Sequence, residues 1–179
     1  MIIARERQKA LDISTLFNWF MIYSSIGWLY ETTYCFLTTG RISNRGFLYG
    51  PYCPIYGLTI LFMVILFSGR YKNIFTLFLS CALAATVLEY FTSYWMETVF
   101  DRRWWNYSDM FLNINGRVCM GASALFGLCG VIFVRYIHPA IVRYINRTFS
   151  DMFIRKINRV ILLLFIIDIL ASFRRSLLV

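Results

Sequence analysis

Residues 74–99 read IFTLFLSCALAATVLEYFTSYWMETV. Neither Lys nor Arg interrupts this stretch, and its two carboxylates, Glu89 and Glu97, lie in its second half. A helix needs about 20 mostly apolar residues to cross the hydrocarbon core of a bilayer. Residues 74–99 therefore predict a transmembrane helix.

Four other apolar blocks surround this helix. The last of them is short and contains Asp168, so a four-span topology is the alternative to five spans. The blocks cover residues 15–38, 54–68, 118–137 and 160–173. We predict an all-α, polytopic membrane helix bundle of about five transmembrane helices, forming a single domain over residues 1–179.

Composition supports a membrane protein. Hydrophobic residues make up 59% of the chain and charged residues 15%, against about 45–50% and about 25% in soluble domains. The net charge of +9 comes from basic residues that flank apolar blocks, which favours lipid contact over nucleic-acid binding. The five Cys include no C-x-x-C pair and the single His is His138, so we expect no metal site and no cofactor.

The distribution of Lys and Arg predicts orientation. With five spans, one side carries eleven basic residues and the other carries seven. Cytoplasmic loops are enriched in Lys and Arg. We therefore expect a multi-pass protein of the cell membrane with a cytoplasmic amino terminus.

The segment at residues 140–158 has an amphipathic pattern. Apolar residues such as Ile141, Ile145 and Phe153 recur at helical spacing, and Arg143 and Arg147 lie on another face. This pattern predicts a helix lying in the cytoplasmic interface. The alternative is that it forms the polar start of a long last helix, which continues through residues 159–175.

Polar residues gather at the first and third loops and at the adjoining helix ends. Alternate loops of a polytopic protein share one membrane face, and these two are predicted on the outer face. Charged side chains within the membrane need partners or water. The alternatives are a ligand pocket and a set of ion pairs that tie helix ends together. The pocket candidates are Glu31, Asn44, Arg45, Glu89, Glu97, Arg103, Asn115 and Arg117.

Three further features have two interpretations each. Trp104 and Trp105 are predicted interface anchors, with cation binding as a second choice. The Gly- and Pro-rich residues 46–57 predict either a re-entrant stretch or a surface turn. Asp168 should face another helix or be protonated, and it is a candidate for an oligomer contact.

Five short motifs carry a family resemblance. They are GWLYE (27–31), NRGFLYGP (44–51), PIYG (54–57), RWWNYS (103–108) and NINGRVC (113–119). In this order they resemble the CmpB-like family labelled "putative ABC-transporter type IV", over roughly residues 15–140. In the fourth motif Asn106 stands where the family usually has Asp.

The resemblance implies a transport component, a permease-like subunit. The chain has no G-x-x-x-x-G-K-[ST] loop, so hydrolysis would need a separate ATPase subunit, docked on the basic residues 140–159, and a homo-oligomer is expected. The alternative is a membrane-embedded enzyme or binding protein for a lipid or small amphiphile, with Glu89 or Glu97 as acid or base. No Ser/His/Asp or Cys/His set is evident, so an enzyme is the less favoured class.

Overall fold

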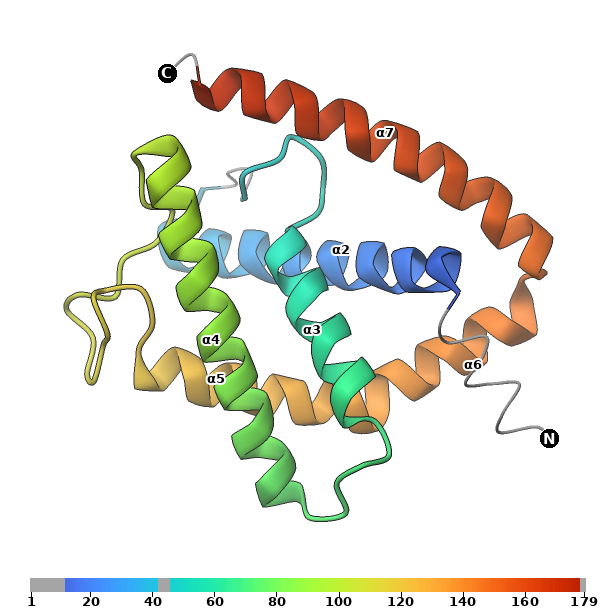
Figure 1. The fold of residues 1–179 in the computed structure, drawn as a ribbon, viewed down its shortest axis with the longest axis horizontal. Coiled ribbons are helices and arrows are strands. Elements are labelled where there is room, and N and C mark those ends of the chain that lie inside the picture. Colours follow the sequence, from blue (N-terminus) through green and yellow to red (C-terminus); the bar gives the residue numbers. More distant parts are fainter. Residues whose placement is uncertain (1–11, 42–45, 178–179) are drawn as a thin grey trace. The chain divides into compact units, whose positions relative to one another are not determined.

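Helices make up all the regular structure that the computed structural model describes, which is residues 12–41 and 46–177. α5, the π turn η1 and α6 form one continuous helix, so the described part holds five helices. The prediction of an all-α chain is confirmed for these residues. The elements are α2 (Ile13–Thr39), α3 (Pro54–Phe67), α4 (Ile74–Phe100), α5 (Met120–Ile132), η1 (Phe133–Ile137), α6 (His138–Thr148) and α7 (Asp151–Leu177) (Figure 1).

Two of the described helices are long and apolar enough to cross a membrane. They are Ile74–Phe100 and the continuous helix Met120–Thr148. α3 is apolar but has only 14 residues. Spans beyond these two stay a prediction.

The chain folds into two compact units. The first holds α2, the first part of α3, and the chain from Tyr144 through α7. The second covers Phe62–Arg143, with α4 and α5.

Two glycines let α2 and α3 approach closely in the first unit. A Cβ on Gly27 would lie 2.4 Å from the Tyr56 ring, and one on Gly57 would lie 2.0 Å from Ser24 Oγ and 2.7 Å from the Phe20 carbonyl oxygen. The Cys53 amide also donates to the Ser24 carbonyl at 2.9 Å. Small residues bring helix backbones together in this way in membranes, where the hydrophobic effect does not drive helix association.

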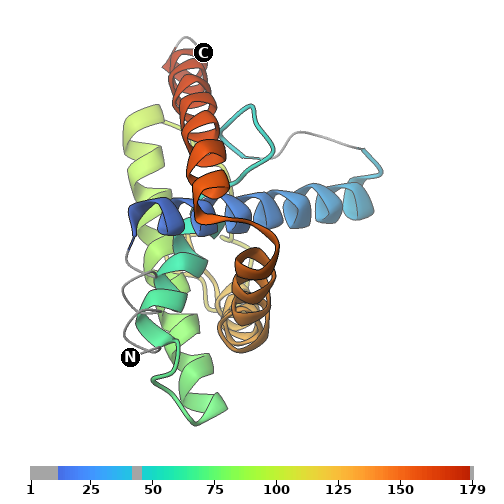
Figure 2. The ribbon, with the colours of Figure 1, turned by 90° about the vertical axis from the view of Figure 1, so that its right-hand side faces the viewer.

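α7 crosses α2 at a steep angle in the same unit (Figure 2). At the crossing, the buried Asn158 side chain donates to the Ser14 carbonyl oxygen at 2.8 Å and accepts from Asn18 Nδ2 at 3.2 Å. Further along, the Phe165 ring packs edge-on against the rings of Phe17 and Phe20. An amide network and an aromatic cluster therefore hold α7 on α2.

In the second unit α4 and α5 pack antiparallel through small residues. Thr86 Oγ1 donates to Ser123 Oγ at 2.6 Å, and a Cβ on Gly127 would lie 2.9 Å from the Ala82 Cβ. A Cβ on Gly130 would lie 2.7 Å from the Cys81 Cβ. Rising numbers on α5 meet falling numbers on α4, which defines the antiparallel direction.

The sequence predicted an apolar block that ends at residue 137, before His138 and Pro139, but the helix that begins at Met120 continues past them. The His138 amide donates to the Phe133 carbonyl in a π turn, and the helix continues to Thr148. Proline lacks an amide and normally breaks or kinks an α-helix, whereas a wide turn places the Pro ring without that clash.

The amphipathic residues 140–158 therefore do not form one helix. The chain breaks at Phe149 and Ser150, so residues 140–148 end the preceding helix and residues 151–158 begin α7. α6 still carries Arg143 and Arg147 on its exposed side and has no buried residue. For residues 151–158, the alternative of a polar start to a long last helix is the correct one.

We expect Gly57→Ala to lower the free energy of unfolding by about 1–3 kcal/mol, because the new methyl group would overlap the backbone of α2. Gly121→Ala is the matched control, since a Cβ there meets no atom within 4 Å and alanine favours helix. Unfolding midpoints of both variants in detergent measure this. Equal midpoints would contradict a close α2–α3 contact.

Candidate functional site

The loop after α4 folds back onto the last turns of that helix. Asn115 and Gly116 have positive φ angles of 54° and 67°, and the Gly116 carbonyl accepts from the Tyr107 amide at 2.7 Å. Asn106 Oδ1 accepts from the Ser108 amide at 3.0 Å and from its hydroxyl at 2.6 Å. A Cβ at Gly116 would lie 2.6 Å from Asn106 Oδ1, so only glycine fits this turn.

Glu97 joins the two halves of this loop to α4. Arg103 Nε donates to Glu97 Oε1 at 2.7 Å, and the Arg117 guanidinium forms an ion pair with Glu97 Oε2. Arg103 also donates to the Asn115 carbonyl at 3.1 Å. One carboxylate thus holds two guanidinium groups that come from opposite ends of the loop.

Arg117 is the most enclosed cation of the described residues around α4. It is 8% exposed, and its guanidinium lies 5.8 Å and 5.3 Å from the ring centroids of Tyr90 and Tyr94. Its Nη1 donates to Ser93 Oγ at 3.3 Å. Aromatic faces attract a desolvated cation, so the α4 surface is built to hold this guanidinium.

Glu89 lies two turns before Glu97 and is 6% exposed. Its carboxylate accepts a hydrogen bond from the Tyr107 hydroxyl at 3.0 Å. Asn115 Nδ2 donates to the Tyr90 hydroxyl at 2.9 Å. We call the set of Glu89, Tyr90, Glu97, Arg103, Tyr107, Asn115 and Arg117 the α4–loop cluster. Its two carboxylates balance its two guanidinium groups.

The two tryptophans of the loop have different surroundings. Trp105 Nε1 donates to the Arg117 carbonyl at 2.9 Å, so it supports the loop from within. The Trp104 ring packs against Phe100 and lies under the Arg102 guanidinium at 5.3 Å. Their role as interface anchors stays a prediction.

Asp168 holds the connection between α2 and α3 in the first unit. Its carboxylate accepts from the Tyr49 and Gly50 amides at 3.0 and 2.8 Å, and from the Tyr52 hydroxyl at 2.7 Å. Ser172 Oγ donates to it as well, at 3.0 Å. We call Asp168 and its four partners, Tyr49, Gly50, Tyr52 and Ser172, the Asp168 clamp. Figure 1 shows the α2–α3 connection extending from the start of α3 toward α7. Asp168 thus meets the α2–α3 connection, where the sequence predicted either a neighbouring helix or a protonated side chain. An oligomer contact at Asp168 stays a prediction.

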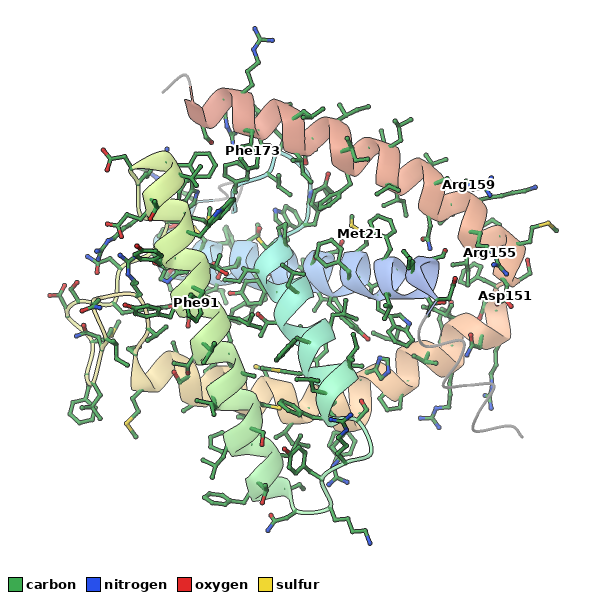
Figure 3. All side chains as sticks on the ribbon, viewed as in Figure 1. Met21, Phe91, Asp151, Arg155, Arg159 and Phe173 are labelled. Carbon is green, nitrogen blue, oxygen red and sulfur yellow. The ribbon has the colours of Figure 1, made fainter. Side chains whose placement is uncertain are left out.

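Further contacts fix the same connection on α7. Arg175 Nη2 donates to the Phe47 carbonyl at 2.8 Å, and its guanidinium lies 4.0 Å from the Tyr49 ring centroid. The Phe47 ring packs edge-on against Phe173, which points inward from α7 in Figure 3.

The predicted pocket residues fall into three groups. Glu89, Glu97, Arg103, Asn115 and Arg117 come together in the α4–loop cluster of the second unit. Glu31 lies on α2 in the first unit, where it accepts from the Tyr56 hydroxyl. Asn44 and Arg45 lie outside the described residues. Whether any of them binds a ligand stays a prediction, and residues 12–41 and 46–177 hold no group of three or more potential metal ligands.

Sequence reasoning missed the tyrosines and the Asp168 clamp. Tyr90 and Tyr94 are spaced four residues apart and end beside Glu97, which is the one sequence signal that could have indicated a cation-holding face. No local pattern relates Asp168 to residues more than a hundred positions earlier.

Residues 18–173 match the family described as "Putative ABC-transporter type IV". The chain belongs to this family. No curated protein and no solved structure matches it. The match reaches beyond residue 140, so the family region includes α6 and most of α7, contrary to the limit expected from the motifs.

The structure divides the five family-like motifs between the two units. The first and third motifs meet where Gly27 and Gly57 bring α2 and α3 together, and the described part of the second forms the connection on α7. The fourth and fifth build the loop of the α4–loop cluster. Asn106 acts there through its side-chain oxygen alone, which a carboxylate would also provide, so Asn in place of the usual Asp keeps the turn.

We expect the Glu97–Arg117 pair to be more strongly coupled than the Glu97–Arg103 pair. The Arg117 side chain is 10% exposed and the Arg103 side chain 35%, so solvent screens the second pair more. Double-mutant cycles on unfolding in detergent, with Gln at each position, should give a coupling energy at least about twice as large for the first pair as for the second. Equal couplings would contradict the enclosure of Arg117.

Asp168→Ala should release the connection from α7. Charge-assisted hydrogen bonds contribute about 1.5–3 kcal/mol each, so hydrogen exchange at the Tyr49 and Gly50 amides should become roughly 10–150-fold faster. Ser172→Ala is the control, because it removes one donor and leaves both amides bound. Unchanged exchange in Asp168→Ala would show that the clamp does not hold the connection.

Proposed function

We propose that this chain is a multi-pass membrane component of a transport system, a permease-like subunit that works with a separate ATPase. Family membership supports the transport context. The observation that carries the membrane placement is one exposed apolar face on α4.

That face consists of large side chains every four residues. Phe75, Leu79, Leu83, Val87 and Phe91 are between 45% and 66% exposed. They extend over about 24 Å of helix, at 1.5 Å per residue. Soluble proteins rarely expose an apolar surface of this extent, whereas lipid would cover it at no cost.

α7 supports a further span despite its central aspartate. Arg159 and Arg174 are 15 residues apart, so about 22 Å of helix carries no cation. Arg155 lies one turn further out, and long basic side chains at helix ends can extend to the surface of a bilayer core of about 30 Å. A carboxylate at such depth costs about 2.5–3.5 kcal/mol on insertion scales. The Asp168 clamp offsets that cost with four hydrogen bonds from within the chain.

The same geometry favours a re-entrant connection between α2 and α3. Asp168 lies about 10 Å along α7 from Arg175, so residues 49–52 would lie at that depth if Arg175 marks the surface. Irregular backbone is tolerated in a membrane only where protein or water satisfies it. The Asp168 carboxylate satisfies two of its amides.

Orientation follows from the distribution of positive charge. We propose a cytoplasmic amino terminus in the cell membrane, with α6 on the same side. Arg143 and Arg147 are exposed on α6, and this basic face is the proposed docking surface for an ATPase subunit. An assembly of two or more copies would complete a translocation path that five helices are too few to enclose.

A second candidate function is binding of a lipid or small amphiphile at the α4–loop cluster. The observation that favours it is the buried Glu89 carboxylate, which faces a neutral phenol in Tyr107 while Glu97 takes both guanidinium groups. In this case Glu89→Gln would abolish activity and leave the folded yield unchanged. Loss of folded protein would favour a purely structural role.

The docking proposal predicts the behaviour of charge-reversed α6. On purification, the double variant Arg143→Glu/Arg147→Glu should retain about a tenth or less of the ATPase subunit that the wild type retains. Its new carboxylates would repel the acidic surface that the proposed docking requires on the ATPase. The control Arg41→Glu/Arg102→Glu changes two exposed cations on the opposite predicted side and should retain as much as the wild type. Quantitative mass spectrometry of the purified complex measures both.

Purification of wild-type protein without any ATPase would contradict the transport proposal. Retention of lipid by such a self-sufficient assembly would favour the second candidate. Equal loss of ATPase in both double variants would contradict docking on α6 alone.

A further inference from the structure

α7 has two distinct faces. Asn158, Phe165, Asp168 and Ser172 turn toward α2 and the α2–α3 connection, as described above. The other face is exposed and apolar over Val160, Leu163, Ile167 and Leu170, which are between 54% and 65% exposed and spaced three or four residues apart. We call these four residues the α7 stripe.

A group of cations lies at the start of the α7 stripe. Arg155, Lys156 and Arg159 are exposed on the first turns of α7, and none of them has an ion-pair partner within residues 12–41 and 46–177. Together with Met152 and Asp151 they line an open hollow of about 530 Å³. Figure 3 shows Asp151, Arg155 and Arg159 following one another along these turns. The single carboxylate leaves the hollow with a net charge of +2.

Aromatic side chains lie at the corner between α6 and α7, close in sequence to the residues that line the hollow. The Phe149 and Phe153 rings stack at 5.4 Å with 9° between their planes, and Tyr144 packs edge-on against Phe149 at 6.4 Å. All three are exposed. Tyr rings are enriched at the ends of membrane helices, so Tyr144 favours headgroup depth for this corner.

We propose that the start of α7 binds one anionic phospholipid, with its phosphate in the hollow and an acyl chain along the α7 stripe. This inference rests on the proposed function, because it requires that α7 lies in a membrane. Lys156 and Val160, one turn apart, join the cations to the stripe on the same face. The stripe from Val160 to Leu170 is about 15 Å long, which is half the thickness of a bilayer core and suits one leaflet.

Charge and shape together select this ligand. Each Lys or Arg near an anionic membrane surface adds binding energy, and three cations within five residues concentrate it at one headgroup. A soluble phosphate compound would use the cations and leave the stripe uncovered. A zwitterionic lipid would use the stripe but gain little from a net charge of +2.

The test compares lipid affinity in two matched double variants. Full-length protein is placed in phosphatidylcholine nanodiscs, and retained phosphatidylglycerol is measured by native mass spectrometry during titration. Arg155→Gln/Arg159→Gln should lower phosphatidylglycerol affinity about 30-fold, a factor of about five for each cation. Arg70→Gln/Lys72→Gln removes two exposed cations of the same predicted side, which precede the exposed apolar face of α4 but line no part of the hollow, and should leave affinity unchanged.

Several results would overturn the lipid site. Equal losses in the two double variants would mean that general attraction to a charged surface explains the binding. Competition by inorganic phosphate as effective as that by phosphatidylglycerol would mean that the acyl chain makes no contribution. Wild-type protein that enters the nanodiscs without preferring phosphatidylglycerol would refute this site and leave the membrane proposal standing. Protein that does not enter them would refute both.

Discussion

The hydrogen bonds between the Asp168 carboxylate and two consecutive backbone amides are the interaction on which the first unit depends. An aspartate among Ile and Leu is costly, and so is an irregular Gly- and Pro-rich connection with unsatisfied amides. Each supplies what the other lacks. The donors at Tyr49, Gly50 and Tyr52 satisfy the charge, and the charge orders the connection that leads into α3. α7 therefore fixes the conformation of the α2–α3 connection, although the two are distant in sequence.

The second unit satisfies its charges by a different arrangement. Glu97 is placed between two guanidinium groups, and Arg117 is enclosed by tyrosine rings. Here the loop supplies the cations and the helix supplies the carboxylates. Close helix contacts underlie both units, since Gly57 on α3 and Gly127 on α5 each lie against a neighbouring helix where a methyl group would not fit. Polar satisfaction and small contact residues are linked, because helices must approach closely before their short polar side chains can meet.

Helices were the part of the fold most accessible from the sequence. The predicted block 74–99 corresponds to α4 at Ile74–Phe100, and the block 15–38 corresponds to α2 at Ile13–Thr39. Continuous apolar composition determines such elements locally. Residues around Pro139 were misjudged because the rule that proline ends a helix assumes 3.6 residues per turn, which η1 does not keep. The split of residues 140–158 also depended on a local break that amphipathic spacing alone does not reveal.

The candidate site was predictable only in part. Glu89, Glu97 and Arg117 could be grouped because one helix and the loop that follows it carry them. The partners of Asp168 could not be found, since they depend on how α7 returns to the α2–α3 connection. Glu31 was also grouped with these residues by predicted membrane side; its contact within the first unit is Tyr56, and a shared pocket stays a prediction.

The π turn at η1 has a consequence for how the chain tolerates changes of length. A π turn holds one residue more than an α-turn, so deletion of one residue between Phe133 and Ile137 would restore regular helix geometry. The wide turn takes up the extra residue within itself, so after such a deletion α6 would present Arg143 and Arg147 in nearly the same direction as before. A deletion of one residue within α5, where every turn is regular, would instead rotate those side chains by about 100° relative to the residues before it.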